Sequence, residues 1–139
     1  MTQRFASCVC GQLQVRCQKD PRRVSMCHCV DCQRRTGSIF SIAAFFDRGT
    51  ISVVRGASKA FTRDSAAGKP VTFHFCPDCG STVFWEPNRM PQLIGIAVGA
   101  FADLSFPQPD QSVWTNNKHA WLSLPGEMRT FAAMPPPRI

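Results

Sequence analysis

The spacing of the cysteines constrains this chain more than any other feature. Seven of the eight cysteines fall into three clusters: Cys8-Val9-Cys10-Gly11, Cys27-His28-Cys29-Val30-Asp31-Cys32 and Cys76-Pro77-Asp78-Cys79-Gly80. Thiolates one or two residues apart can reach a single ion, and two such pairs complete the tetrahedral four-sulfur shell that suits zinc. A cluster of three sulfurs leaves the fourth corner to a ligand that is not protein. The sequence therefore predicts one closed and one open metal site, with two zinc ions per chain.

An even number of cysteines also fits a secreted chain held together by disulfides. Two observations argue against that interpretation. The segment Met1-Thr2-Gln3-Arg4-Phe5 is polar and contains no apolar signal sequence. Sulfurs in a Cys-x-Cys pair are also poor disulfide partners but easy metal ligands. We therefore expect a cytoplasmic protein, because the reducing cytosol disfavours disulfides and this pattern there more often binds metal.

Length and composition predict one globular domain over residues 1–139, with a Pro-rich C-terminal tail from about residue 134. Hydrophobic residues make up 44% of the chain and charged residues 18%, which is typical of a chain with a folded core. The run 93–101 is apolar but short and contains Gly95 and Gly99, so it predicts a buried strand rather than a membrane span. We expect no membrane partner.

The charge balance favours small anions as partners. The formal net charge is +7, and seven thiolates (−7) with two zinc ions (+4) would bring it to about +4. The basic residues are spread along the chain, with adjacent pairs only at Arg22-Arg23 and Arg34-Arg35. A scattered excess attracts small anions, whereas a nucleic-acid interface needs a concentrated basic stripe. The sequence therefore argues against a nucleic-acid partner.

Short runs of alternating apolar and polar residues predict a mainly β fold. The expected strands are 12–17, 38–47, 51–55, 71–75, 82–85 and 92–100. One helical turn is expected from Asp31 to Thr36, closed by Gly37. Cys17 has the same parity as Leu13 and Val15, so it is expected to be a buried core thiol rather than a ligand.

The three clusters can be joined in two ways. The Cys76–Cys79 segment predicts a metal-binding turn, since backbone N–H groups in such a turn face the sulfurs and Gly80 permits a positive φ. Joining it to the similar Cys8–Cys10 pair leaves the middle cluster as a compact three-sulfur set. The alternative joins it to two cysteines of the middle cluster. That choice separates the remaining thiolates widely in sequence and ranks second.

These motifs resemble the glutathione-dependent formaldehyde-activating enzyme family, which is also named for its centromere-protein-V-type members. The similarity runs from about Cys8 to Trp121. It rests on Cys8-x-Cys10-Gly11, on Cys27-His28-Cys29-x-x-Cys32 followed by Gly37, and on Phe75-Cys76-x-x-Cys79-Gly80-Ser81. The resemblance implies a mainly β fold of antiparallel strands, tent-like and built around zinc, with at most one or two short helical turns.

The resemblance also implies a ligand set that agrees with the first pairing. It places Cys8, Cys10, Cys76 and Cys79 at a structural zinc, and Cys27, Cys29 and Cys32 at a second, reactive zinc. Three positions depart from the family pattern, and one of them is Cys17, which is an extra cysteine. Phe61 stands where many members carry Tyr, and Ser112 stands where a His often occurs. These departures concern the substrate rather than the seven ligands.

An open zinc with three thiolates is formally −1, so it is a weak Lewis acid that suits a fourth thiolate. The resemblance implies that a small thiol such as glutathione binds there and adds to an aldehyde such as formaldehyde. The product is an S-hydroxymethyl adduct, and the reverse reaction is that of a carbon-sulfur lyase. Spacing alone shows only the open site.

Other polar residues near the clusters have simpler interpretations. His28 lies between two ligands, where a side chain more often points away than carries protons or binds metal. His74 is expected to be structural, and His119 is expected in a surface loop rather than in a pocket. Either Arg34 or Arg35 would suit a substrate carboxylate, and a solvated helix face is equally expected. Asp31 and Asp78 are expected to cap turns rather than to carry protons.

A second hypothesis belongs to another class. A β domain with zinc and basic residues also suits a non-catalytic, zinc-ribbon-like binding module for nucleic acid or protein. The missing fourth ligand in the middle cluster and the scattered charge argue against it. The two hypotheses differ in whether the second zinc accepts a small thiol.

Overall fold

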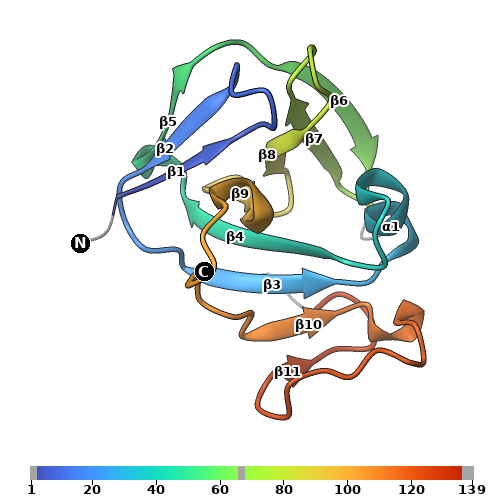
Figure 1. Ribbon diagram of the computed structural model, residues 1–139. Helices are drawn as coiled ribbons and strands as arrows, with labels where there is room; N and C mark the ends of the chain where they lie inside the picture. The colour runs from blue at the N-terminus through green and yellow to red at the C-terminus, as the bar shows by residue number, and fades with distance from the viewer. Residues whose placement is uncertain (1–2, 66–67, 136–139) are drawn as a thin grey trace.

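The computed structural model describes residues 3–65 and 68–135, which form two β-sheets (Figure 1). The smaller sheet has the strand order β1-β2-β5 and the larger has the order β11-β10-β3-β4-β9-β8-β7-β6. The strands are β1 (Arg4–Ser7), β2 (Gln14–Cys17), β3 (Arg23–Cys27), β4 (Ser41–Asp47), β5 (Ile51–Arg55), β6 (Lys59–Asp64), β7 (Pro70–Phe75), β8 (Thr82–Pro87), β9 (Leu93–Ala97), β10 (Gln111–Val113) and β11 (Arg129–Thr130). The expectation of a mainly β fold with antiparallel strands is confirmed, although β10 pairs parallel with both β3 and β11.

The main core lies between the two sheets. Leu13 and Val15 on the side of the smaller sheet pack with Phe46 of β4 and Ile96 of β9, and all four are fully buried. Burial of a side chain of this size stabilises the fold by about 1.5–3 kcal/mol. Cys17 belongs to the same cluster and is fully buried, as predicted.

Most of the expected strands are present with shifted ends. The run 51–55 coincides with β5, and 71–75 and 82–85 correspond to β7 and β8. The run 38–47 becomes a strand only from Ser41. The run 92–100 ends as a strand at Ala97 and continues as the 3-10 turn η2 (Val98–Phe101). Two further 3-10 turns are η1 (Arg48–Thr50) and η3 (Thr115–Asn117).

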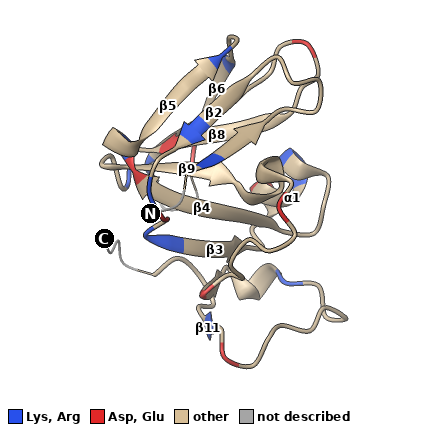
Figure 2. Ribbon diagram, turned by 60° about the vertical axis from the view of Figure 1, so that its left-hand side comes forward, with Lys and Arg blue, Asp and Glu red and all other residues tan. Residues whose placement is uncertain are grey.

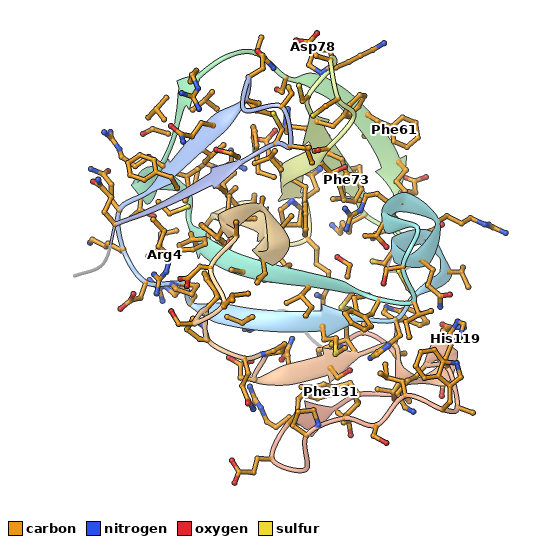
Figure 3. All side chains as sticks on the ribbon, viewed as in Figure 1. Arg4, Phe61, Phe73, Asp78, His119 and Phe131 are labelled. Carbon is orange, nitrogen blue, oxygen red and sulfur yellow. The ribbon has the colours of Figure 1, made fainter. Side chains whose placement is uncertain are left out.

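Prediction from alternating apolar and polar residues misses strands whose two faces have similar surroundings. In β3 the successive residues Val24, Ser25 and Met26 are all buried, so the strand has no solvent-exposed face that would give an alternating pattern. Strand β6 is the opposite case, because it forms the edge of the larger sheet and is exposed along most of its length. Figure 3 shows Phe61 of β6 on the outer surface, whereas Phe73 of β7 is 5% exposed and lies toward the interior.

The predicted helical turn is α1 (Val30–Thr36). Cys29 is its N-cap, and its sulfur accepts a hydrogen bond from the amide of Cys32 at 3.3 Å. Gly37 ends the helix in the left-handed conformation at φ 71°, as predicted, and its amide bonds to the carbonyl of Gln33. The helix therefore begins at the middle cysteine cluster.

Charge is distributed over many elements of the fold. Figure 2 shows Lys and Arg on strands of both sheets and on α1, interspersed with acidic residues. No helix among residues 3–65 and 68–135 is long and apolar enough to cross a membrane. The expected Pro-rich tail falls largely on residues 136–139, outside the described residues, whereas Pro135 is buried against the body of the protein.

Candidate metal centres

The first and last cysteine pairs meet at one place in the fold. The Sγ atoms of Cys8, Cys10, Cys76 and Cys79 all lie within 4.8 Å of one another. The Cys8–Cys10 and Cys10–Cys76 sulfur pairs are each 3.7 Å apart. Four sulfurs at about 2.3 Å from a tetrahedral zinc stand about 3.8 Å from each other, so this four-cysteine cluster has the dimensions of a zinc shell. All eight cysteines are free thiols, which contradicts the disulfide interpretation.

Nitrogen donors face the sulfurs of the four-cysteine cluster. The Leu13 amide donates to Cys8 Sγ at 3.2 Å, and Gln12 Nε2 donates to Cys76 Sγ at 3.1 Å. The other end of the Gln12 amide accepts a hydrogen bond from the backbone of Ala57 at 2.6 Å, which fixes the side chain. Donors of this kind stabilise thiolate sulfur, the form that binds a metal.

The turn around Cys76 has the predicted form. The Asp78 amide lies 3.4 Å from Cys76 Sγ, and Gly80 has φ 78°. Figure 3 shows Asp78 at the outer end of the fold. A hydrogen bond from Ser81 lowers the pKa of Cys79 to about 5. The segment therefore presents two sulfurs that accept hydrogen bonds rather than donate them.

Cys27, Cys29 and Cys32 form the second cluster, with all three Sγ atoms within 4.8 Å of one another. Cys27 ends β3, Cys29 caps α1 and Cys32 lies in the first turn of the helix. A strand end followed directly by a helix start thus holds three sulfurs together. Among the described residues, no fourth Cys, His, Asp or Glu joins this three-cysteine cluster. The donor set fits a soft divalent ion such as zinc with one position open.

Protons are unequally shared within the three-cysteine cluster. Hydrogen bonds from Cys27 and Cys32 lower the pKa of Cys29. Hydrogen bonds to Cys29 and Cys32, together with burial, raise the pKa of Cys27. Deprotonation of the cluster therefore begins at Cys29, the helix cap, where the amide of Cys32 also donates to the sulfur.

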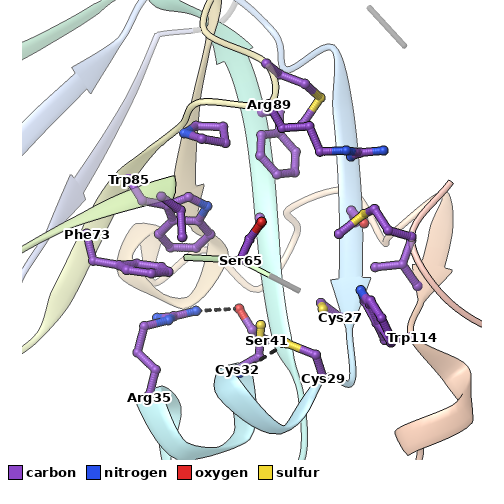
Figure 4. Close-up of a pocket in the computed structure, with 18 of the residues that line it drawn as sticks. Cys27, Cys29, Cys32, Arg35, Ser41, Ser65, Phe73, Trp85, Arg89 and Trp114 are labelled. Carbon is purple, nitrogen blue, oxygen red and sulfur yellow. Dashed lines mark hydrogen bonds between the residues drawn. The ribbon is translucent and has the colours of Figure 1, made fainter. Parts of the chain in front are cut away.

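A cavity of about 130 Å³ adjoins the three-cysteine cluster (Figure 4). All three cysteines line it, as do the aromatic side chains of Phe45, Phe73, Trp85 and Trp114. Four of its lining residues are arginines: Arg23, Arg35, Arg63 and Arg89. None of the described residues that line the cavity is Asp or Glu. The three cysteines therefore border an apolar, cationic space.

Arg35 stands beside the sulfurs in an aromatic cage. Its guanidinium carbon lies 4.8 Å from the centroid of the Phe73 ring and 4.7 Å from that of Trp85. Its Nη2 donates to Ser41 Oγ at 2.8 Å, and burial lowers the pKa of the group. Arg34, its neighbour, is exposed and does not line the cavity. Of the two arginines considered from the sequence, only Arg35 reaches the site.

The three histidines do not line the cavity. His28 is fully buried, its Nε2 lies 2.7 Å from Ser112 Oγ, and burial lowers its pKa. His74 stacks on Phe84 at 4.4 Å and bonds through Nε2 to Glu86 at 2.8 Å, as befits a structural residue. Figure 3 shows His119 at the periphery.

Several site residues carry no signal in the sequence. Arg63 comes from the edge strand β6, contacts the Phe73 ring at 5.2 Å and pairs with Asp31 at 3.5 Å. Trp114 has a left-handed backbone at φ 58°, which is strained for a residue that is not glycine. Its Nε1 and the hydroxyl of Ser65 are buried and have no hydrogen-bond partner among the described residues.

Comparison with known families decides the affiliation of the chain. A sequence model of the family described as glutathione-dependent formaldehyde-activating enzyme matches residues 3–117. The chain belongs to this family. The matched residues include both cysteine clusters and Trp114. Met134 and Pro135, which also line the cavity, lie beyond the match.

A solved structure shares the fold. The crystal structure of a Rhodobacter sphaeroides protein is 22% identical in sequence and covers 76% of this chain and 91% of its own, with a TM-score of 0.53. At this level of identity the likeness concerns the fold alone. The formaldehyde-activating fold of this chain therefore has an experimental counterpart.

Proposed function

We propose that this protein is a zinc-dependent enzyme that joins a small thiol, such as glutathione, to an aldehyde, such as formaldehyde, and cleaves the adduct in reverse. The observation that carries the proposal is the three-cysteine cluster with its open corner on a cavity of about 130 Å³. A zinc ion bound by Cys27, Cys29 and Cys32 would lower the pKa of a substrate thiol while leaving its sulfur nucleophilic. We propose that a second ion bound by Cys8, Cys10, Cys76 and Cys79 is structural.

The walls of the cavity supply what the addition requires. The substrate sulfur forms a bond to the aldehyde carbon, the electrons of the C=O π bond move to the oxygen, and that oxygen takes up the proton lost by the thiol. Two donors that line the cavity would suit the developing negative charge. They are the Trp114 N–H and the Ser65 hydroxyl, which have no other partner among the described residues.

The electrostatics of the cavity favour the thiolate form of the substrate. Arg35 lies against two aromatic rings, so its positive charge stays beside the sulfurs when the cavity is dry. Phe73 and Trp85 exclude water from the same wall. We infer that these residues position the thiolate and protect the adduct from solvent.

Exchange NMR tests this proposal. An equilibrium mixture of glutathione and ¹³C-formaldehyde forms the adduct without enzyme, and the exchange rate is read from cross-peaks between free and bound formaldehyde. The zinc-loaded protein is expected to raise this rate in proportion to its concentration, and elemental analysis is expected to give two zinc ions per chain. Cys29→Ser should lose the acceleration and one zinc. Exchange no faster than in buffer, both with glutathione and with a smaller thiol in its place, would overturn the enzymatic function. Full acceleration by Cys29→Ser would remove the three-cysteine cluster from the mechanism.

A further inference from the structure

The cavity is small for the thiols that a tripeptide-binding enzyme would take. Its volume is about 130 Å³. An apolar protein cavity of about 150 Å³ accommodates benzene, a ligand of six non-hydrogen atoms. The space beside the three-cysteine cluster therefore fits a ligand of similar size, whereas glutathione is much larger.

The far end of the cavity carries a cation that forms no ion pair with the described residues. Figure 4 shows Arg89 at the end opposite the cysteines. Arg35 is caged and bonded to Ser41, and Arg63 pairs with Asp31. Arg89 donates to the carbonyl of Pro135 and takes part in none of the ion pairs formed by the described residues.

Burial disfavours an uncompensated positive charge at this end of the cavity. Burial, and then the nearby positive charge of Arg23, lowers the pKa of Arg89. No Asp or Glu among the described residues lines the cavity beside Arg89. The half-buried guanidinium of Arg89 favours a ligand that brings negative charge, and a guanidinium matches a carboxylate with two parallel hydrogen bonds.

The segment that closes this end lies outside the family match. The match ends at residue 117, and the chain then returns through β11 so that Met134 and Pro135 line the cavity. Pro135 is buried, and its carbonyl accepts the hydrogen bond from Arg89. The C-terminal segment thus sets the length of the cavity and orients the arginine.

We propose that the thiol substrate of this protein is a compact acidic thiol, with its sulfur at Cys27, Cys29 and Cys32 and its carboxylate on Arg89. The inference rests on the proposed function. In it, Met134 and Pro135 determine the size of the substrate, and Arg89 determines its charge. A thiol and a carboxylate separated by a few carbon atoms satisfy both ends of the cavity at once.

Calorimetry on the zinc-loaded protein tests the inference with three thiols. 3-Mercaptopropionate carries the carboxylate, 3-mercaptopropan-1-ol has the same length without the charge, and glutathione has the larger size. We expect the acid to bind roughly tenfold or more tightly than the alcohol, since a hydrogen bond to a charged group favours binding by at least this factor. Glutathione should bind more weakly than the acid, and Met134→Ala should narrow that difference.

Two arginine variants separate a local contact from net charge. Arg89→Met should abolish the preference for the acid over the alcohol, whereas Arg34→Gln, which removes the same charge from an exposed position on α1, should keep it. Zinc content and melting temperature check that both variants are folded. If wild-type protein binds all three thiols without preferring the compact acid, the inference is wrong and the proposed function stands. If no thiol binds at millimolar concentration, both fail.

Discussion

Gly95→Ala is expected to destabilise the protein by displacing a tryptophan of the cavity wall. Gly95 of β9 lies opposite Trp85 of β8. A Cβ atom added to Gly95 would stand 2.4 Å from Trp85 Nε1 and 2.8 Å from its Cε2, closer than atoms in proteins approach. Trp85 is 6% exposed and packs on Phe73 and Arg35, so it cannot yield without disturbing the cage around that guanidinium.

The expected magnitude follows from the cost of overpacking a core. An added methyl group in a close-packed site costs about 1–3 kcal/mol. In a chain of this length each kcal/mol lowers the melting temperature by about 2–4 °C, so we expect a loss of roughly 2–12 °C. Thermal unfolding of the zinc-loaded protein, followed by circular dichroism, measures this loss.

Gly49→Ala provides the matched control. No atom lies within 4 Å of a Cβ added at Gly49, and its φ is not in the left-handed region. The same substitution there should change the free energy of unfolding by no more than about 0.5 kcal/mol. If the Gly95 and Gly49 variants melt at the same temperature, Trp85 moves freely and the rigid cage is refuted.

Two further predictions concern metal and pH. Cys76→Ser should unfold or aggregate the protein, because Cys76 is fully buried in the four-cysteine cluster, whereas the Cys29→Ser variant should stay folded. Thermal melts of the two variants test this. Equal and severe losses of stability would make both clusters structural and would support a binding module. Hydrogen bonds from Arg48 and His74 lower the pKa of Glu86 below its usual 4.5, so the carboxylate stabilises the folded state above pH 4.5 and loses this effect as the pH falls through its folded pKa. The melting temperature of wild-type protein should therefore exceed that of Glu86→Gln at pH 7 and approach it in acid, and a pH-independent difference would contradict this linkage.

The cysteine clusters are predictable from sequence where their geometry is local. Cys27, Cys29 and Cys32 are held together by one strand end and one helix start, and the Gly37 cap that closes the helix is visible in the sequence. To predict that the Cys8–Cys10 pair joins the Cys76–Cys79 pair, only one assumption was needed, namely that two similar turns meet. The two turns do meet, since Cys8 and Cys76 belong to the same buried cluster.

The walls of the cavity are not predictable in this way, because tertiary packing assembles them from distant segments. Arg63 lies in an exposed edge strand without an alternating pattern, and Arg89 lies in the connection between β8 and β9. Trp114 reaches the site because its backbone is left-handed, and no sequence motif predicts this conformation. The sequence shows that basic residues are scattered, and only the fold shows that four arginines converge on one space.

The charges around the three-cysteine cluster connect the metal to the proposed choice of substrate. Three thiolates and one divalent ion sum to −1, and the caged guanidinium of Arg35 offsets this charge at a contact with the cluster. Arg63 is offset by Asp31. A neutral thiol that binds as a thiolate would add −1 at the sulfur end and leave Arg89 at the far end without a counter-charge. An acidic thiol adds negative charge at both ends, so it compensates the arginine in the same step that brings sulfur to the open corner. Arg89 forms no ion pair with any of the described residues, and it therefore favours a dianionic substrate.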